Sequence, residues 1–225
     1  MSIYGPLEQM GIPAVVQSAL LAGILLFASA MMVRRQIAAT GGGVLPDEGI
    51  SIRNVLEFVV QNLAQIAREN MGDEYRKYFP LVGTIFFFIL VSNLLGLIPG
   101  VGGASSYVET TTAWAIISVV TAEAVGIRKH GFGYIKHYLG PVVWLAPFFF
   151  ILEIPIHISR IITLSVRLLA NMFADHTIVS VWILLVPAIV PAIFMGLGLV
   201  IAVLQAFVFS LLTMVYIGQA LEEAH

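Results

Sequence analysis

The sequence predicts an all-α integral membrane protein with about five membrane-crossing helices and one amphipathic helix at the membrane surface. Of its 225 residues, 59% are hydrophobic and only 11% are charged, whereas soluble domains carry about 25% charged residues. Several apolar runs exceed the ~20 residues that a helix needs to cross a bilayer. Since no soluble domain fits between these runs, we expect a single membrane domain over residues 1–225.

The composition also excludes several classes of function. The net charge of −2 provides no basic field for nucleic acid, and the absence of cysteine rules out disulfides and thiolate metal sites. The sequence contains no glycine-rich phosphate loop, nucleophile–base pair or metal-ligand cluster, so we expect no cofactor and no catalysis by this chain alone. Only Glu8 is charged before the first apolar run, which we therefore expect to be a retained span rather than a cleaved signal.

The first four predicted helices follow in order. Residues 12–33 form an apolar span. Residues 50–71 place apolar side chains at helical spacing and polar ones on the other face, a pattern typical of a helix at the membrane interface. Two more spans cover residues 79–99 and 109–127. Helix breakers separate these segments: Gly41, Gly42, Gly43 and Pro46, then the Gly/Ser stretch 100–107.

Two long apolar runs end the chain, at residues 142–185 and 186–221. The second run would form a helix of about 54 Å at 1.5 Å per residue, against a hydrocarbon core of ~30 Å. Each run is therefore either broken or strongly inclined. Four prolines mark the places where breaks or a hinge would fall: Pro147, Pro155, Pro187 and Pro191. We favour two inclined helices that form a hairpin, a shape suited to wrapping a curved partner.

The distribution of basic residues predicts the orientation. Nine of the eleven Lys and Arg residues fall between the first and second spans or between the third span and residue 142. Because positive charges accumulate on the cytoplasmic side, we expect the amino terminus outside and the carboxyl terminus in the cytoplasm.

Arg167 is the most informative residue, because it stands in the middle of an apolar run. Its charge at membrane depth costs about 2.5–3.5 kcal/mol on insertion scales and is tolerated mainly at functional positions. Its neighbours one turn away, Thr163 and Asn171, are neutral, so no carboxylate on its own helix cancels the charge. Gln205, in the last run, could face it as a neutral hydrogen-bonding partner. The chain is therefore predicted to move ions.

A polar stripe surrounds this arginine. Steps of three or four residues place seven positions on one face of a helix: Glu153, His157, Arg160, Leu164, Arg167, Asn171 and Asp175. His176 lies on the flank of this stripe. Lipid cannot satisfy polar groups, so the stripe should face protein or water. The alternative for Glu153, His157 and Arg160 is a local ion-pair set that only holds helices together.

Other polar residues are weaker candidates. Glu109 opens a span at the predicted outer mouth, although an acid there also suits the helix dipole. Glu123 is about one turn from Arg128 and Lys129, and a plain snorkelling pair with them is favoured over a relay role. Asn93 lies near a span end, where it could simply join helices. Tyr216 is expected to anchor the last helix at the membrane interface.

Three motifs resemble subunit a of the F-type ATP synthase, the membrane stator of its proton channel. They are the segment from Glu153 through Arg167 to Met172, the pair Leu204–Phe209 and Leu212–Tyr216, and the segment Asn93–Pro99. The resemblance extends from about Tyr78 to the end of the chain, and the region before Tyr78 carries little family signal.

The resemblance implies specific roles. Arg167 would face a ring of c subunits, keep a ring carboxylate deprotonated as it passes, and block protons from crossing directly between two half-channels. Asn171 and Gln205 would line that contact. The aqueous path from the outer side would be lined by Glu109, Glu153 and His176. The implied partners are the c-ring, peripheral-stalk b subunits and the rest of the synthase, in a bacterial inner membrane.

The sequence departs from the family pattern near this path. His176 stands where many members have glutamate, and members with histidine there often have a glutamate at the position of Gly198. Asp175 or Glu153 would take over that role. A frequent Asp-x-Asn-x-Thr pattern reads instead from Glu109 to Ala113.

Two other classes of function remain open at this point. A secondary transporter could use the polar stripe for its substrate, but such proteins usually show internal repeats, and none is evident here. A membrane anchor without transport would not need the stripe. Whether the ion is H⁺ or Na⁺ depends on the ring carboxylate.

Overall fold

The computed structural model describes residues 12–39, 52–98, 100–131, 146–186 and 189–222, and within these ranges it contains helices and no strand. Five stretches of helix are long and apolar enough to cross a membrane. The predicted all-α membrane fold is thereby confirmed.

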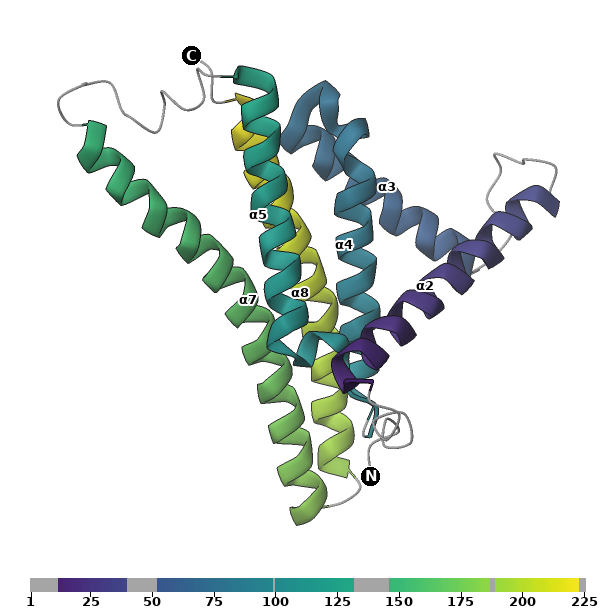
Figure 1. Cartoon of the computed structure of the whole chain (residues 1–225). Coiled ribbons are helices and arrows are strands. Elements are labelled where there is room, and N and C mark those ends of the chain that lie inside the picture. Colours follow the sequence, from purple (N-terminus) through teal and green to yellow (C-terminus); the bar gives the residue numbers. More distant parts are fainter. Residues whose placement is uncertain (1–11, 40–51, 99, 132–145, 187–188, 223–225) are drawn as a thin grey trace.

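The first helices form the middle of the molecule and one of its flanks. Their bounds are α2 (Ala14–Ala39), α3 (Ile52–Met71), η1 (Gly72–Glu74), α4 (Tyr75–Gly96), η2 (Ala104–Ser106) and α5 (Val108–His130). Figure 1 shows α4, α5 and α8 (Ile189–Glu222) running together in the centre, with α2 and α7 (Ala146–Leu185) splayed to either side. The core between them is apolar and includes Ile85, Ile89, Phe209, Met214 and Ile217.

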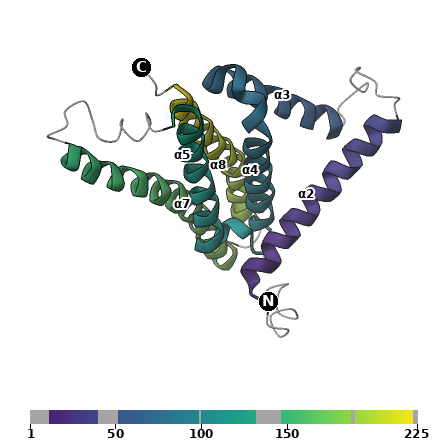
Figure 2. The same cartoon turned by 45° about the horizontal axis from the view of Figure 1, so that its top comes forward.

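The α3 helix has the amphipathic character that the sequence predicts. Leu63, Ala67 and Met71 are buried where α3 packs against α4 and α8, whereas Val55 and Phe58 are exposed. Figure 2 shows α3 crossing the end of the central helices instead of running parallel to them. Its apolar face therefore covers one end of the bundle.

Helices α7 and α8 extend without a break through the long apolar runs. At 1.5 Å per residue they are about 60 and 51 Å long. Pro155 lies inside α7 without ending it. Pro147 and Pro191 fall in first turns, where a missing N–H breaks no helical hydrogen bond. Figure 1 shows α7 inclined to α5, and the helix is not broken between Ala146 and Leu185. The predicted turn at Pro187 lies outside the described residues.

The two long helices lie antiparallel along a shared seam. Three contacts join them: Trp182 stacks on Phe194 with ring centroids 5.8 Å apart, Asn171 bonds to Gln205 at 2.7 Å, and Arg160 lies 5.0 Å above the ring of Tyr216. Each contact is eleven residues from the next on both helices, which is about three helical turns. One face of α7 therefore packs against one face of α8 along most of their length.

Candidate functional site

The polar stripe of α7 faces the rest of the molecule. His157, Arg160, Arg167, Asn171 and Asp175 are all partly buried. The opposite face is apolar and about half or more exposed, with Ile158, Ile162, Val166 and Phe173 among its members. Polar groups on one side and aliphatic groups on the other suit a helix that lies between protein and lipid.

Arg167 is partly buried in the middle of α7. Among the described side chains, no carboxylate forms an ion pair with its guanidinium group. The hydroxyl of Ser165, two residues before Arg167, contacts α5. It lies 3.1 Å from the hydroxyl of Thr111 and 2.9 Å from that of Thr112. This helix-to-helix anchor was missed from the sequence, because Ser165 lies off the polar stripe.

The bond between Asn171 and Gln205 lies one turn beyond Arg167. The Nδ2 group of Asn171 donates to Oε1 of Gln205. Gln205 is only 6% exposed. Its Nε2 group is buried and has no partner among the described residues. A buried donor without an acceptor costs about 1–3 kcal/mol.

A cavity of about 310 Å³ lies farther along α7, between that helix and residues 96–98 and 100–102. Asp175 and His176 line it. The Nε2 atom of His176 is buried and has no partner among the described residues. It would lie 3.4 Å from a Cβ placed on Gly96. The cavity has both the room and the polar groups that water needs.

Gly198 of α8 borders the same region. A Cβ placed at this position would lie 3.8 Å from the Oδ2 atom of Asp175. The resemblance associates this position with a glutamate in members that carry histidine at the position of His176. In this chain the carboxylate of Asp175 approaches it from the opposite helix.

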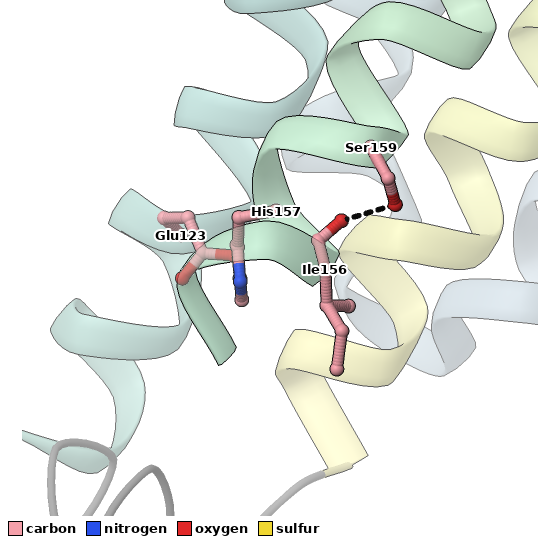
Figure 3. A network of polar contacts seen from close by, with 4 residues as sticks. All are labelled: Glu123, Ile156, His157 and Ser159. Carbon is pink, nitrogen blue, oxygen red and sulfur yellow. Dashed lines mark hydrogen bonds and ion pairs between the residues drawn. The ribbon is translucent and has the colours of Figure 1, made fainter. Parts of the chain in front are cut away.

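A second group of polar contacts lies toward the beginning of α7. The Nε2 atom of His157 is 2.6 Å from Oε1 of Glu123 on α5, and Figure 3 shows the two side chains side by side between these helices. The stripe of α7 alone suggested a local set with Glu153 and Arg160, and the periodicity of α5 suggested Arg128 as the partner of Glu123. The observed contact joins residues 34 positions apart, which neither pattern could reveal.

Arg160 contacts α8 in this group. Its guanidinium group lies over the ring of Tyr216, a favourable cation–π contact. Tyr216 is partly buried and packs against the core. This side chain therefore helps to join α7 to α8, and its expected position at the membrane interface stays a prediction.

The remaining candidates are dispersed. Asn93 is 1% exposed and donates to the carbonyl oxygen of Ala202 at 3.3 Å, so it joins α4 to α8. Glu109 is exposed in the first turn of α5, and Thr163 is exposed on α7. The side chain of Glu153 lies outside the described ones.

Glu153 and His176 belong to opposite ends of α7. The 23 residues between them correspond to about 35 Å along the helix. Figure 1 places the start of α7 toward the end where α5 and α8 finish.

The arrangement along α7 has a simple order. His157, which pairs with Glu123, lies ten residues before Arg167 on α7, about 15 Å along the axis. Asp175 lies eight residues after Arg167, about 12 Å along the axis. A fixed positive charge thus separates two sets of titratable groups. No group of metal-ligating side chains occurs in the part of the chain that the structure describes.

Comparison with known proteins agrees with these features. The family model described as ATP synthase A chain matches residues 15–218. "ATP synthase subunit a 3" of Pelobacter propionicus is 40% identical over 97% of this chain and 92% of its own length. "ATP synthase subunit a" of Geotalea uraniireducens is 38% identical over the same shares.

The match also corrects one expectation. It begins at residue 15, well before Tyr78, so the amino-terminal region does carry family signal. Its generic apolar composition concealed that signal from motif inspection. The motifs around Arg167 and Gln205, the five apolar helices and the matches over nearly the whole sequence agree. The chain belongs to the ATP synthase A chain family.

Proposed function

We propose that this chain is the ion-translocating stator subunit of a rotary F-type ATP synthase in a bacterial inner membrane. It would carry no catalytic site of its own and would couple ion flow to rotation of a ring of c subunits. The observation that carries the proposal is Arg167, a membrane-embedded cation without a carboxylate partner among the described residues. Membership of the family and five helices able to cross a membrane support it.

Arg167 supplies the electrostatic element of the mechanism. A ring carboxylate in lipid favours its neutral form, and a nearby guanidinium favours the ionised form. Each ring carboxylate would release its proton as it approaches Arg167 and bind another after passing. The same positive charge repels protons, so it prevents a direct leak along the helix.

The Asn171–Gln205 bond would shape the surface that meets the ring. Asn171, which donates this bond, lies one turn from the arginine. The outer faces of α7 and α8 nearby are apolar and exposed, including Val166, Leu204 and Val200. Such a surface suits an apolar partner in the membrane, here the ring.

The access path from the outer side would use the cavity at Asp175 and His176. Glu109, at the start of α5, would lie near its mouth. Asp175 would supply the carboxylate that relatives place near the position of Gly198. Glu153 would belong to the opposite half of the membrane.

The orientation proposed from the charges places the amino terminus outside and the carboxyl terminus in the cytoplasm. Arg34 and Arg35 near the end of α2, and Arg128 and Lys129 at the end of α5, lie toward one end of the molecule in Figure 1. That end would face the cytoplasm. Peripheral-stalk b subunits and membrane lipid would cover other outer surfaces.

The deciding experiment is ATP-driven acidification of inverted vesicles that contain the whole complex. Arg167→Ala should abolish acidification while immunoblots of the purified complex show normal assembly. Ser159→Ala is the control, because its exposed hydroxyl bonds only to the carbonyl oxygen of Ile156 on the same helix. Normal pumping by an assembled Arg167→Ala complex would refute the proposal and return attention to a transporter that uses the stripe.

A further inference from the structure

The contact between His157 and Glu123 has the properties of a proton-carrying pair. The two groups are 2.6 Å apart, and their side chains are 20% and 25% exposed. They lie within helices that cross the membrane, yet each retains some access to its surroundings. Histidine and carboxylate are the two side-chain types that most often transfer protons in proteins.

The position of the pair matters as much as its chemistry. It lies on the opposite side of Arg167 from the cavity at Asp175 and His176, toward the end of α5 that carries Arg128 and Lys129. A proton that leaves the ring on this side must cross the remaining half of the membrane. Among the groups that α5 and α7 contribute there, His157 and Glu123 form a direct contact between the helices.

We infer that His157 and Glu123 together carry protons between the ring and the cytoplasmic side. This inference rests on the proposed function and adds to it the residues of the second half-channel. The sequence favoured a plain snorkelling pair for Glu123 over a relay role, and its contact with α7 is the observation that favours the relay role.

The proton balance of the step is simple. One proton is shared between the imidazole and the carboxylate in the resting pair. A proton released by a ring carboxylic acid, relayed by water, forms a new O–H or N–H bond on the pair. Another N–H or O–H bond then breaks as water on the cytoplasmic side takes a proton. One proton enters, one leaves, and no electron is transferred.

The charged surroundings of the pair are defined by three helices. Arg160 lies about one turn along α7, and Tyr216 of α8 lies under its guanidinium group. Arg128 and Lys129 follow Glu123 on α5. The pair therefore lies among cationic side chains contributed by α5 and α7.

The test uses His157→Gln and Glu123→Gln in the whole complex. Glutamine preserves a hydrogen bond between α7 and α5 but cannot titrate, so it separates proton transfer from helix packing. In inverted vesicles the cytoplasmic side faces the medium, so the pH of the medium acts on the pair directly. ATP-driven acidification, normalised to assembled complex, is measured across a range of medium pH.

Each glutamine variant should lower the pumping rate about tenfold, less than the ~100-fold contribution of an ordinary general base because water can partly replace the group. It should also flatten the dependence on medium pH near neutrality. Glu123→Asp keeps a carboxylate and should pump faster than Glu123→Gln, with a shifted pH profile. Ser159→Ala, whose hydroxyl bonds to Ile156 in Figure 3, should match the wild type.

Wild-type rates and pH profiles in the assembled glutamine variants would overturn the inference and leave a structural contact. If one glutamine variant fails to assemble, a wild-type rate and pH profile in the other would overturn it, as would a Glu123→Asp complex that pumps no faster than Glu123→Gln. Failure of the proposed function would look different, because Arg167→Ala would then continue to pump.

Discussion

The side-chain amide of Asn171 donates a 2.7 Å hydrogen bond to the side-chain oxygen of Gln205, across the seam between α7 and α8. This bond is the middle one of three cross-helix contacts spaced eleven residues apart. It sets the register of the two helices one turn from Arg167. A hydrogen bond at this point fixes the position of Arg167 along the helix axis, relative to α8, more specifically than apolar packing would.

The Asn171–Gln205 bond should be energetically coupled. Gln205→Leu or Asn171→Leu alone leaves a polar group unpaired inside the membrane, which costs about 1–2 kcal/mol, whereas the double variant removes both polar groups. We expect the double variant to restore much of the heat resistance that each single variant loses. Thermal denaturation of the purified complex measures this, and strictly additive losses would show that the bond does not contribute. Pumping should stay impaired in all three variants.

His176→Ala should slow proton flux about tenfold and alter its dependence on pH on the outer side, because histidine changes charge closest to neutral pH. The position of His176 in the lining of the cavity and its buried Nε2 atom, which has no partner among the described residues, motivate this expectation. ATP synthesis in vesicles with controlled internal and external pH is the measurement. Thr177→Ala is the control, since its hydroxyl bonds to its own helix at Phe173. An unchanged pH profile in His176→Ala would remove this histidine from the path.

Gly218→Ala should destabilise the packing of α8 on α3. A Cβ at this position would overlap the backbone carbonyl oxygen of Asn70, which no rotamer change can relieve. Overpacking of this kind costs about 1–3 kcal/mol. Gly196→Ala, on the same helix, meets nothing within 4 Å and should be tolerated. The amount of chain in membranes and its heat resistance in detergent compare the two, and equal behaviour would contradict the close approach.

The ion pair between Glu74 and Lys129 should contribute slightly to stability at neutral pH. The ammonium group of Lys129, 2.9 Å away, lowers the pKa of the Glu74 carboxyl below its ordinary value of 4.5. The stabilisation is therefore present above pH 4.5 and is lost as the pH falls through the lower folded value. Both side chains are about 40% exposed, so the effect should be small and weakened by salt.

Lys129→Gln tests this ion pair. Its heat resistance should differ from that of the wild type at neutral pH and low salt, and the two should converge as the medium is acidified. A difference that persists in acid would indicate a role for Lys129 other than pairing with Glu74.

The candidate site was predictable where its signals are local. Arg167, Asn171 and Asp175 were found because helical periodicity places them on one face of one segment, and the structure turns that face inward. The partner of His157 was not predictable in this way. Glu123 belongs to another helix, and periodicity carries no information about which helices become neighbours. The contact between Arg160 and Tyr216 was not predictable for the same reason, since it depends on the register of α7 and α8.

By itself, the sequence determined the membrane class, the approximate extent of each helix and the unpaired charge of Arg167. These follow from hydropathy and helical periodicity, which act over a few turns of one segment. The tertiary structure alone decided the eleven-residue register of α7 on α8, the pairing of His157 with Glu123 and the cavity at His176. Those features depend on how closely helices approach one another. Small residues such as Gly96 and Gly218, and side-chain packing across the seam, set that distance.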